Sequence, residues 1–249
     1  MARYSSKDCV FVVDGYNILG VLADVGHSVE AVLEEDTALG DTWATFDALG
    51  LSKADLSQEG WFDDAADSVN AALNEQQGVS RILTLGFEGN TIGQHFTGYQ
   101  GAMQVDYNRL ASRAKLHRCN ARYQGSGTAE DGRILHALTA QTADGNTEAT
   151  PVDNGAATDY GGAVYLQLTA LTLGGYTDLT VKVRHSADNV TYADLVTFTA
   201  LVTAPGKERK TIAAGAASMR RYLAVSWAFT GTGAGASATF FVGAARNAS

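Results

Sequence analysis

The stretch Ile92–Gly127 constrains the fold of this chain more than any other part of the sequence. Met103, Val105 and Tyr107 alternate with polar residues, which is the period-2 pattern of a β-strand with one buried face. The alternation resumes downstream, so we predict two long strands that are joined near residues 107–108. A hairpin of this length cannot bury itself; it needs a sheet beneath it and a neighbour at its far end. This requirement points to pairing between subunits.

The composition is that of a β-rich protein. At 249 residues the chain should form one large domain or two ordinary ones. The 27 glycines and only two prolines suit strands and turns. No run of about 18 apolar residues is present, so no membrane insertion is expected. The short apolar run near the N-terminus is broken by Asp14, so we interpret this segment as mature structure and not as a signal peptide.

The two cysteines indicate a reducing compartment. Cys9 and Cys119 are far apart in the sequence and form no Cys-x-x-Cys motif. We expect both to be reduced, buried thiols of a protein made in a reducing compartment. A disulfide between them stays open as an alternative.

The charge is distributed unevenly along the chain. Residues 1–150 hold 10 Lys and Arg against 21 Asp and Glu, a net charge of −11, whereas residues 151–249 hold 8 against 6, a net charge of +2. A domain that binds duplex DNA tightly would present a basic face, so this class is disfavoured. An acidic surface beside DNA would instead keep the polymer from adhering.

The first part of the chain is predicted to be mainly β with one α-helix. Asp63 or Asp64 is a suitable N-cap, the apolar residues that follow recur at helical spacing, and Gly78 is placed to follow the C-terminus of the helix. The strands that we predict around the helix and the long hairpin are Val10–Val13, Lys53–Phe62, Arg81–Phe87 and Arg133–Ala140.

A composition shift at residues 142–162 marks a domain boundary, because this stretch is poor in apolar residues and rich in Gly, Asp and Asn. We therefore predict a first domain at 1–145, a linker at 146–162 and a C-terminal β-sandwich or jelly roll at 163–249. The strands predicted in this second domain are Ala163–Leu173, Leu179–His185, Thr191–Leu201, Arg209–Ala214, Arg220–Phe229 and Ala238–Ala245.

No catalytic, cofactor-binding or metal-binding residues are predicted. Twelve carboxylates and one lysine fall between Asp24 and Asp67, but adjacent carboxylates on a strand point to opposite faces and no calcium-loop motif is present. The five histidines show no metal-ligand spacing, and the glycine-rich stretches match no phosphate-binding motif. We interpret the acidic run as a solvated or lumen-facing surface.

One basic set on the long hairpin stands out in this acidic half. We predict that it meets the acidic face of a neighbouring copy, because complementary charge fixes register between partners. Trp43, a large aromatic residue at the end of a predicted loop, is assigned to the same inter-subunit contact. The basic residues are Arg109, Arg113, Lys115, Arg118 and Arg122.

Three segments of the first half resemble the major tail tube protein of long, flexible-tailed (siphovirus-type) bacteriophages. They are Val13–Gly20, Thr37–Trp43 and Leu56–Asp64, the last ahead of a short helix. The segments at residues 181–200 and 220–231 resemble the accessory β-sandwich that many phage tail proteins carry. The family fold, a β-sandwich flanked by a helix, agrees with the order of elements predicted above, and the resemblance transfers no catalytic residue.

The resemblance implies a virion structural protein, assembled in the cytoplasm of a bacterial host. Such proteins form hexameric rings that stack into a tube, and hairpins of the inner sheet line a channel for DNA. The implied partners are further copies of the chain, the terminator, tape measure and distal tail proteins, and DNA in transient, non-specific passage.

Two other function classes remain as alternatives. Aromatic residues of the predicted sandwich favour a carbohydrate-binding module that contacts a host surface glycan, with Tyr176 and Tyr192 as contacts beside Tyr160, Tyr165, Tyr222 and Trp227. An enzyme such as a glycosidase would need two carboxylates held across a cleft, and the sequence offers no such pair.

Overall fold

The computed structural model describes residues 9–35, 46–65, 68–125 and 129–247. The fold is mainly β, as predicted, with antiparallel pairing throughout and a single short α-helix in the described part. In chain order the elements are β1 (Val10–Val13), β2 (Tyr16–Asn17), the 3-10 helix η2 (Leu19–Val21), β3 (Leu22–Glu35), β4 (Phe46–Trp61), α1 (Val69–Leu73), β5 (Ser80–Gly86), β6 (His95–Leu110), β7 (Arg118–Gly125), β8 (Ala129–Gln141), β9 (Gly145–Asn146), β10 (Val152–Asp153), β11 (Gly162–Thr172), β12 (Asp178–Ser186), β13 (Ala193–Thr197), β14 (Gly206–Ile212), β15 (Tyr222–Thr230) and β16 (Ser237–Arg246).

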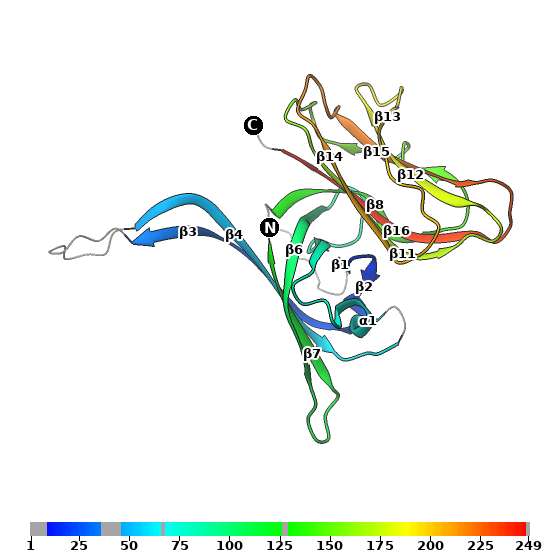
Figure 1. Cartoon of the computed structure of the whole chain (residues 1–249). Coiled ribbons are helices and arrows are strands. Elements are labelled where there is room, and N and C mark those ends of the chain that lie inside the picture. Colours follow the sequence, from blue (N-terminus) through cyan, green and yellow to red (C-terminus); the bar gives the residue numbers. More distant parts are fainter. Residues whose placement is uncertain (1–8, 36–45, 66–67, 126–128, 248–249) are drawn as a thin grey trace.

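Two sheets contain these strands (Figure 1). The larger sheet has the order β14-β11-β16-β8-β6-β5-β1-β2, and from β6 it branches through β7 and β4 to β3. The smaller sheet has the order β10-β15-β12-β13, with β9 paired to β15. Because β8 pairs with both β6 and β16, the larger sheet runs without a break from the first half of the chain into the second.

The main path of the larger sheet curls until its two ends meet. Gln167 of β11 bridges the gap, since its Oε1 accepts a hydrogen bond from the Gly15 amide at 2.7 Å and its Nε2 donates one to the Ile82 carbonyl at 3.0 Å. Gly15 has a φ of +86°, and a Cβ there would lie 2.7 Å from the Leu168 carbonyl oxygen, so only glycine fits this contact. The curl encloses a core that includes Val12, Phe96, Ile134, Tyr165 and Phe241.

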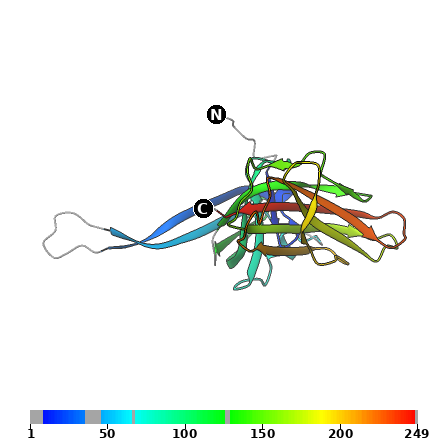
Figure 2. The same cartoon turned by 90° about the horizontal axis from the view of Figure 1, so that it is seen from above.

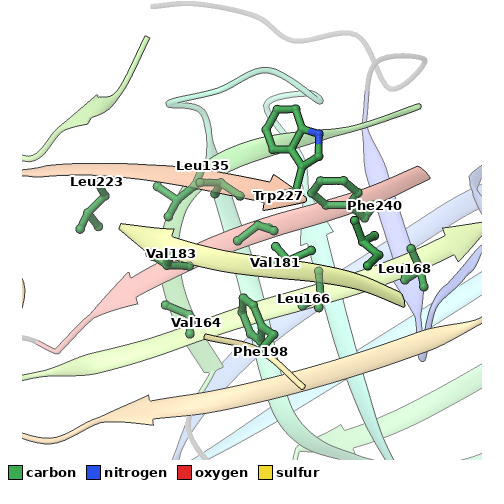
Figure 3. Close-up of a cluster of buried hydrophobic side chains, with 14 of the residues drawn as sticks. Leu135, Val164, Leu166, Leu168, Val181, Val183, Phe198, Leu223, Trp227 and Phe240 are labelled. Carbon is green, nitrogen blue, oxygen red and sulfur yellow. The ribbon is translucent and has the colours of Figure 1, made fainter. Parts of the chain in front are cut away.

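The smaller sheet packs on the outside of this curl and completes a β-sandwich (Figure 3). Alternate residues of β11 therefore face two different cores: Val164, Leu166 and Leu168 point into the sandwich, while Ala163 and Tyr165 point into the curl. A strand that is buried on both faces needs an apolar run instead of an alternation, which is what its sequence shows.

The shared sheet bears on the predicted division into domains. β8 lies in the predicted first domain, yet it pairs with β16 of the predicted second domain over the range Gly132–Gln141. β10 lies in the predicted linker and pairs with β15. The proposed boundaries themselves stay a prediction.

The predicted helix exists, but the predicted limits were wrong. α1 covers only Val69–Leu73, its N-cap is Ser68, and its C-cap is Asn74 instead of a residue next to Gly78. Asp63 does not cap the helix directly: its carboxylate accepts from the Ala65 amide and its carbonyl accepts from the Asn70 amide, so it stabilises the loop that leads into the helix.

The turn of the predicted hairpin was also misplaced. β6 continues to Leu110, and the reversal occupies residues 111–117 instead of 107–108. The register of β6 against β7 shifts between Gln104 and Asp106, which marks a β-bulge. The predicted buried face of this strand was wrong at two positions, since Met103 and Val105 are 37% and 46% exposed whereas Gln104 is fully buried.

The longest hairpin of the described chain is a different one. β3 and β4 pair from Leu22 with Gly60 to Glu35 with Phe46. Their distal half extends away from the body as an arm, as Figures 1 and 2 show from two directions. In the sequence we recognised only the Lys53–Phe62 part of this hairpin as a clear strand.

Candidate assembly surface

The surface most suited to binding is a four-stranded antiparallel sheet with the order β3-β4-β7-β6. One row of this sheet joins His27, Leu56, Tyr123 and Gln104, and its side chains point toward α1 and the body. The opposite face carries mainly polar and charged side chains, together with the exposed Met103.

Both edges of this sheet lack a partner strand within the described chain over part of their length. β3 pairs with β4 alone. Beyond Gln104, whose backbone bonds to Gly78 and Val79, β6 pairs with β7 alone. An edge strand with unpaired N–H and C=O groups is a template for another strand, and proteins that remain monomeric generally shield such edges.

The two edges also run in opposite directions, because two strands, β4 and β7, lie between them in the antiparallel order. A copy that is rotated about an axis along the strands would therefore place its β6 antiparallel to the β3 of its neighbour. This geometry is the more stable form of strand pairing, and it allows the sheet to continue from one copy to the next.

The arm needs a neighbour for a second reason. The pairing of β4 with β7 ends at Asp55, so from Val29 onward β3 and β4 form a ribbon in which, among the described residues, they pair only with each other. Val29 and Leu33 are 54% and 55% exposed on this ribbon. An isolated two-stranded ribbon is marginally stable in water, which makes the arm a candidate contact with another chain.

Three ion pairs lie on the polar face of the sheet: Lys53 with Asp55 at 2.7 Å, Arg118 with Glu59 at 2.8 Å, and Arg122 with Asp106 at 2.7 Å. Asp24 and Glu30 add two further carboxylates on the same face, since Asp24 pairs in register with Glu59 and Glu30 with Lys53. The cations of this face are thus matched within the chain, and the carboxylates are in excess.

The five basic residues predicted to contact a neighbour fall into two groups. Arg109, Arg113 and Lys115 lie exposed at or beside the 111–117 turn. Arg118 and Arg122 are exposed too, but each already pairs with a carboxylate of its own chain. Their contact with another copy stays a prediction, and Trp43 lies outside the described residues.

A buried polar cluster, which the sequence analysis missed, anchors this sheet to the body. Arg81 of β5 is 2% exposed and forms an ion pair with Asp14. It also donates to the Ala72 carbonyl of α1 at 2.6 Å and to Gln104 Oε1 of β6 at 3.2 Å. The Gln104 amide in turn donates to the Leu73 carbonyl at 2.8 Å. One guanidinium therefore connects β1, α1, β5 and β6; the only hint in the sequence is an aspartate directly after a buried strand.

The aromatic residues of the carbohydrate hypothesis do not form one surface. Tyr165 and Trp227 are buried in cores, so assigning these two to a glycan contact was wrong. Tyr176 is partly buried against Phe229, and Tyr192 lies beside Arg184, whose guanidinium is 5.9 Å from its ring centroid. Glycan contact by Tyr176 and Tyr192 stays a prediction.

Within the described part of the chain, no group of three or more His, Cys, Asp or Glu side chains is arranged to hold a metal ion. Cys9 and Cys119 are buried and form no disulfide within the described structure. None of the described helices has the length and apolar character needed to cross a membrane.

Comparison with known proteins gives only distant similarity. No family model matches the sequence, and no curated protein matches it. Among solved structures, a chain from "Virion of native gene transfer agent (GTA) particle" matches 51% of this chain and 97% of its own length, with 14% identity and a TM-score of 0.40. A chain from the tail of an empty GTA particle, computed with C6 symmetry, matches the same shares with 14% identity and a TM-score of 0.38. The SPP1 Dit protein, described as part of a hub adsorption apparatus in phages that infect Gram-positive bacteria, matches 95% of this chain and 98% of its own, with 12% identity and a TM-score of 0.35. At these values the similarities assign no activity or partner to this chain.

Proposed function

We propose that this chain is a structural protein of a bacteriophage tail, and that copies of it join edge to edge into rings of the tail tube. The observation that carries the proposal is the β3-β4-β7-β6 sheet: within the described residues, β3 and the part of β6 beyond Gln104 have no outer partner strand, and these two edges run antiparallel to each other. Backbone pairing between copies would satisfy both edges and close the sheets into a barrel without ends. Six copies per ring, stacked into a tube, is the arrangement that the resemblance to tail tube proteins implies.

Two of the three motifs in the first half that carry the resemblance occupy structural positions, and the third, Thr37–Trp43, lies outside the described residues. Val13–Gly20 forms the turn from β1 through β2 into η2, and Leu56–Asp64 forms the part of β4 that is paired on both sides, together with the loop before α1. These segments position the four-stranded sheet on the body.

The charge supports an internal channel for DNA. α1 and the body cover the apolar face of the sheet, so in a closed ring the polar face would turn toward the bore. This face carries more carboxylates than cations, with Asp24 and Glu30 beyond the three ion pairs. A negative wall repels the phosphate backbone and lets DNA pass without binding.

The proposal predicts ring formation by the purified protein. Negative-stain electron microscopy and sedimentation of the concentrated protein should show rings or tubes. A synthetic peptide with the β3 sequence, LADVGHSVEAVLEE, should compete for the open edge of β6 and reduce ring formation, whereas a peptide of the same composition in scrambled order should not. A protein that stays monomeric at high concentration, alone and with tail partners, would contradict the proposal.

A further inference from the structure

A hollow of about 730 Å³ lies between β8 of the larger sheet and β10 of the smaller one. This volume is within the ~300–1,000 Å³ range of sites that bind small molecules. One wall is formed by β8 and the loop before β6, and the other by β10 and the residues that lead into it. The lining includes the hydroxyl groups of Thr91 and Thr150, the charged Arg133 and Asp153, and the apolar Ile92 and Pro151.

The loop before β6 is fixed on β8 by several hydrogen bonds. The Asn90 side chain donates to the Leu138 carbonyl at 3.1 Å and accepts from the Leu138 amide at 2.7 Å. The Gly93 amide donates to the Ile134 carbonyl at 2.8 Å, and the Gly93 carbonyl accepts from Arg133 Nη1 at 2.8 Å. Because this wall is already ordered, a ligand would bind without the entropic cost of fixing a loop.

The Asp153 carboxylate on the other wall is also held in place. Arg221 donates two parallel hydrogen bonds to it, at 2.7 and 2.6 Å, and the Gly155 amide donates a third at 2.8 Å. The Arg221 guanidinium lies over the ring of Tyr222, 4.8 Å from its centroid. The hydrogen bonds from Arg221, and then the one from Gly155, lower the pKa of Asp153 to about 2. The carboxylate therefore stays charged at neutral pH and accepts hydrogen bonds.

Arg133 is the charged group of this hollow that lacks an opposite charge. Its side chain is exposed, and among the described residues its guanidinium donates only to the Gly93 carbonyl. A guanidinium carries five N–H donors in a planar fork that suits a carboxylate. Asp153, in contrast, is already neutralised by Arg221. The hollow is therefore complementary to an anion and not to a cation.

A suitable ligand combines an anionic group with hydroxyl groups and a small apolar face. The anion would meet Arg133, the hydroxyl groups would meet Asp153, Thr91 and Thr150, and the apolar face would pack on Ile92. An acidic sugar presents these three features on one ring. A nucleotide also carries an anion and hydroxyl groups, but none of the described residues that line the hollow is an aromatic platform for its base.

We infer that this hollow binds an acidic saccharide, with the sugar carboxylate on Arg133 and sugar hydroxyl groups on Asp153, Thr91 and Thr150. The site is separate from Tyr176 and Tyr192, which do not line the hollow. It adds a binding activity to the proposed structural role. Both walls belong to one copy of the chain, so binding does not depend on ring formation.

Isothermal titration calorimetry of the full chain tests the site. The probes are trigalacturonate, a hyaluronan tetrasaccharide and sialyllactose, which carry the carboxylate on three different sugar rings. At least one of them should bind. The methyl ester of the same probe keeps its rings and hydroxyl groups but not its charge, so it should bind about tenfold more weakly or less.

Substitutions in the hollow identify the place of binding. Arg133→Gln should weaken the binding of the acidic probe about tenfold or more, because it removes the partner of the carboxylate. Thr150→Val, which keeps the shape of the side chain but not its hydroxyl group, should weaken it severalfold. Arg113→Gln changes an exposed cation of the 111–117 turn and should have no effect. Circular dichroism and thermal melting check that each variant is folded.

Three results would overturn the inference. They are the absence of binding to all three acidic probes, equal affinity for an acidic probe and its methyl ester, and an affinity that Arg133→Gln leaves unchanged. The last result would mean that the sugar binds elsewhere on the chain. None of them bears on the proposed rings, whose formation electron microscopy measures independently.

Discussion

The substitution Asp14→Ala is expected to lower the free energy of unfolding by about 3–5 kcal/mol, the usual cost of removing one partner of a buried ion pair. Asp14 Oδ2 accepts from Arg81 and, at 2.5 Å, from Lys207 Nζ, while Oδ1 accepts from the Ile82 amide at 2.8 Å. Because Arg81 is buried, the substitution would leave a guanidinium charge away from water with only neutral acceptors. A loss of this size is a large part of the ~5–15 kcal/mol that typically holds a domain folded.

Urea titration followed by tryptophan fluorescence and circular dichroism measures this effect. The control is Glu59→Ala, which removes one partner of the exposed pair with Arg118 and should cost no more than about 1 kcal/mol. The double variant Asp14→Ala/Arg81→Met should recover part of the loss, because it removes the stranded charge as well. An Asp14→Ala protein as stable as the Glu59→Ala protein would show that the cluster does not anchor the sheet.

The second large effect is a loss of stability between pH 6.5 and pH 4 that depends on His136. Its ring stacks on Phe240, with ring centroids 4.2 Å apart, and meets Trp227 edge-on at 4.9 Å. Burial in this aromatic site lowers the pKa of His136 from 6.5 to about 4, although hydrogen bonds to the backbone of Phe240 and Ala137 oppose the shift. Since the folded-state pKa is below the unfolded-state pKa, the unfolded chain binds the additional proton over this interval.

The sign of the effect follows from proton linkage. The contribution of neutral His136 is fully present above pH 6.5 and is lost as the pH falls toward 4. At 1.36 kcal/mol per unit of pKa, the loss amounts to about 3 kcal/mol. The difference in unfolding free energy between the unmodified protein and His136→Phe, measured by urea titration from pH 4 to pH 7.5, should change by this amount.

A second variant separates the titration from the packing. His136→Gln retains a group that can hydrogen-bond to the Phe240 carbonyl but does not titrate, so it should share the flatter pH dependence of His136→Phe whatever its absolute stability. A slope between pH 4 and pH 6.5 that is the same in all three proteins would mean that other groups, and not His136, govern the acid sensitivity.

Local patterns in the sequence were sufficient to predict most strands of the second half. Leu179, Val181 and Val183 alternate with polar residues, and β12 places them in the sandwich core as expected. Period-2 alternation indicates which face of a strand is buried, and a few neighbouring residues are enough to show it. The presence of a helix after β4 was predictable for the same reason, although its start was not, because Asp63 binds the backbone of the loop before it caps any helix.

Features that depend on distant partners were not predictable. The bulge between Gln104 and Asp106 and the continuation of β6 to Leu110 were not predicted, since only the pairing with β7 shows them. The distal part of β3 was not recognised as an arm. Neither face of this part is covered within the described chain, as the exposed Val29 and Leu33 show, so its sequence has no clear alternation of apolar and polar residues.

The basic residues of the hairpin show how much of the candidate site could be predicted from the sequence. Their clustering was visible in the sequence, and three of them do lie together at one end of the sheet. Only the fold reveals that Arg118 and Arg122 already pair with carboxylates from β4 and β6, respectively, and that the acidic arm lies at the far end of the same sheet.

The sequence by itself determined that this protein is built of antiparallel strands, that its charge is concentrated in the first half, and that its hairpin end is basic, because each of these properties is local to a few residues or a sum over many. Only the tertiary structure decided that β8, β11 and β16 each contribute side chains to two hydrophobic cores. It also decided that Arg81 connects four elements, and that β3 and β6 are the edge strands of one four-stranded sheet. These features depend on which strands pair across separations of up to about a hundred residues, and strand pairing is set by the burial of the whole chain, which no short stretch encodes.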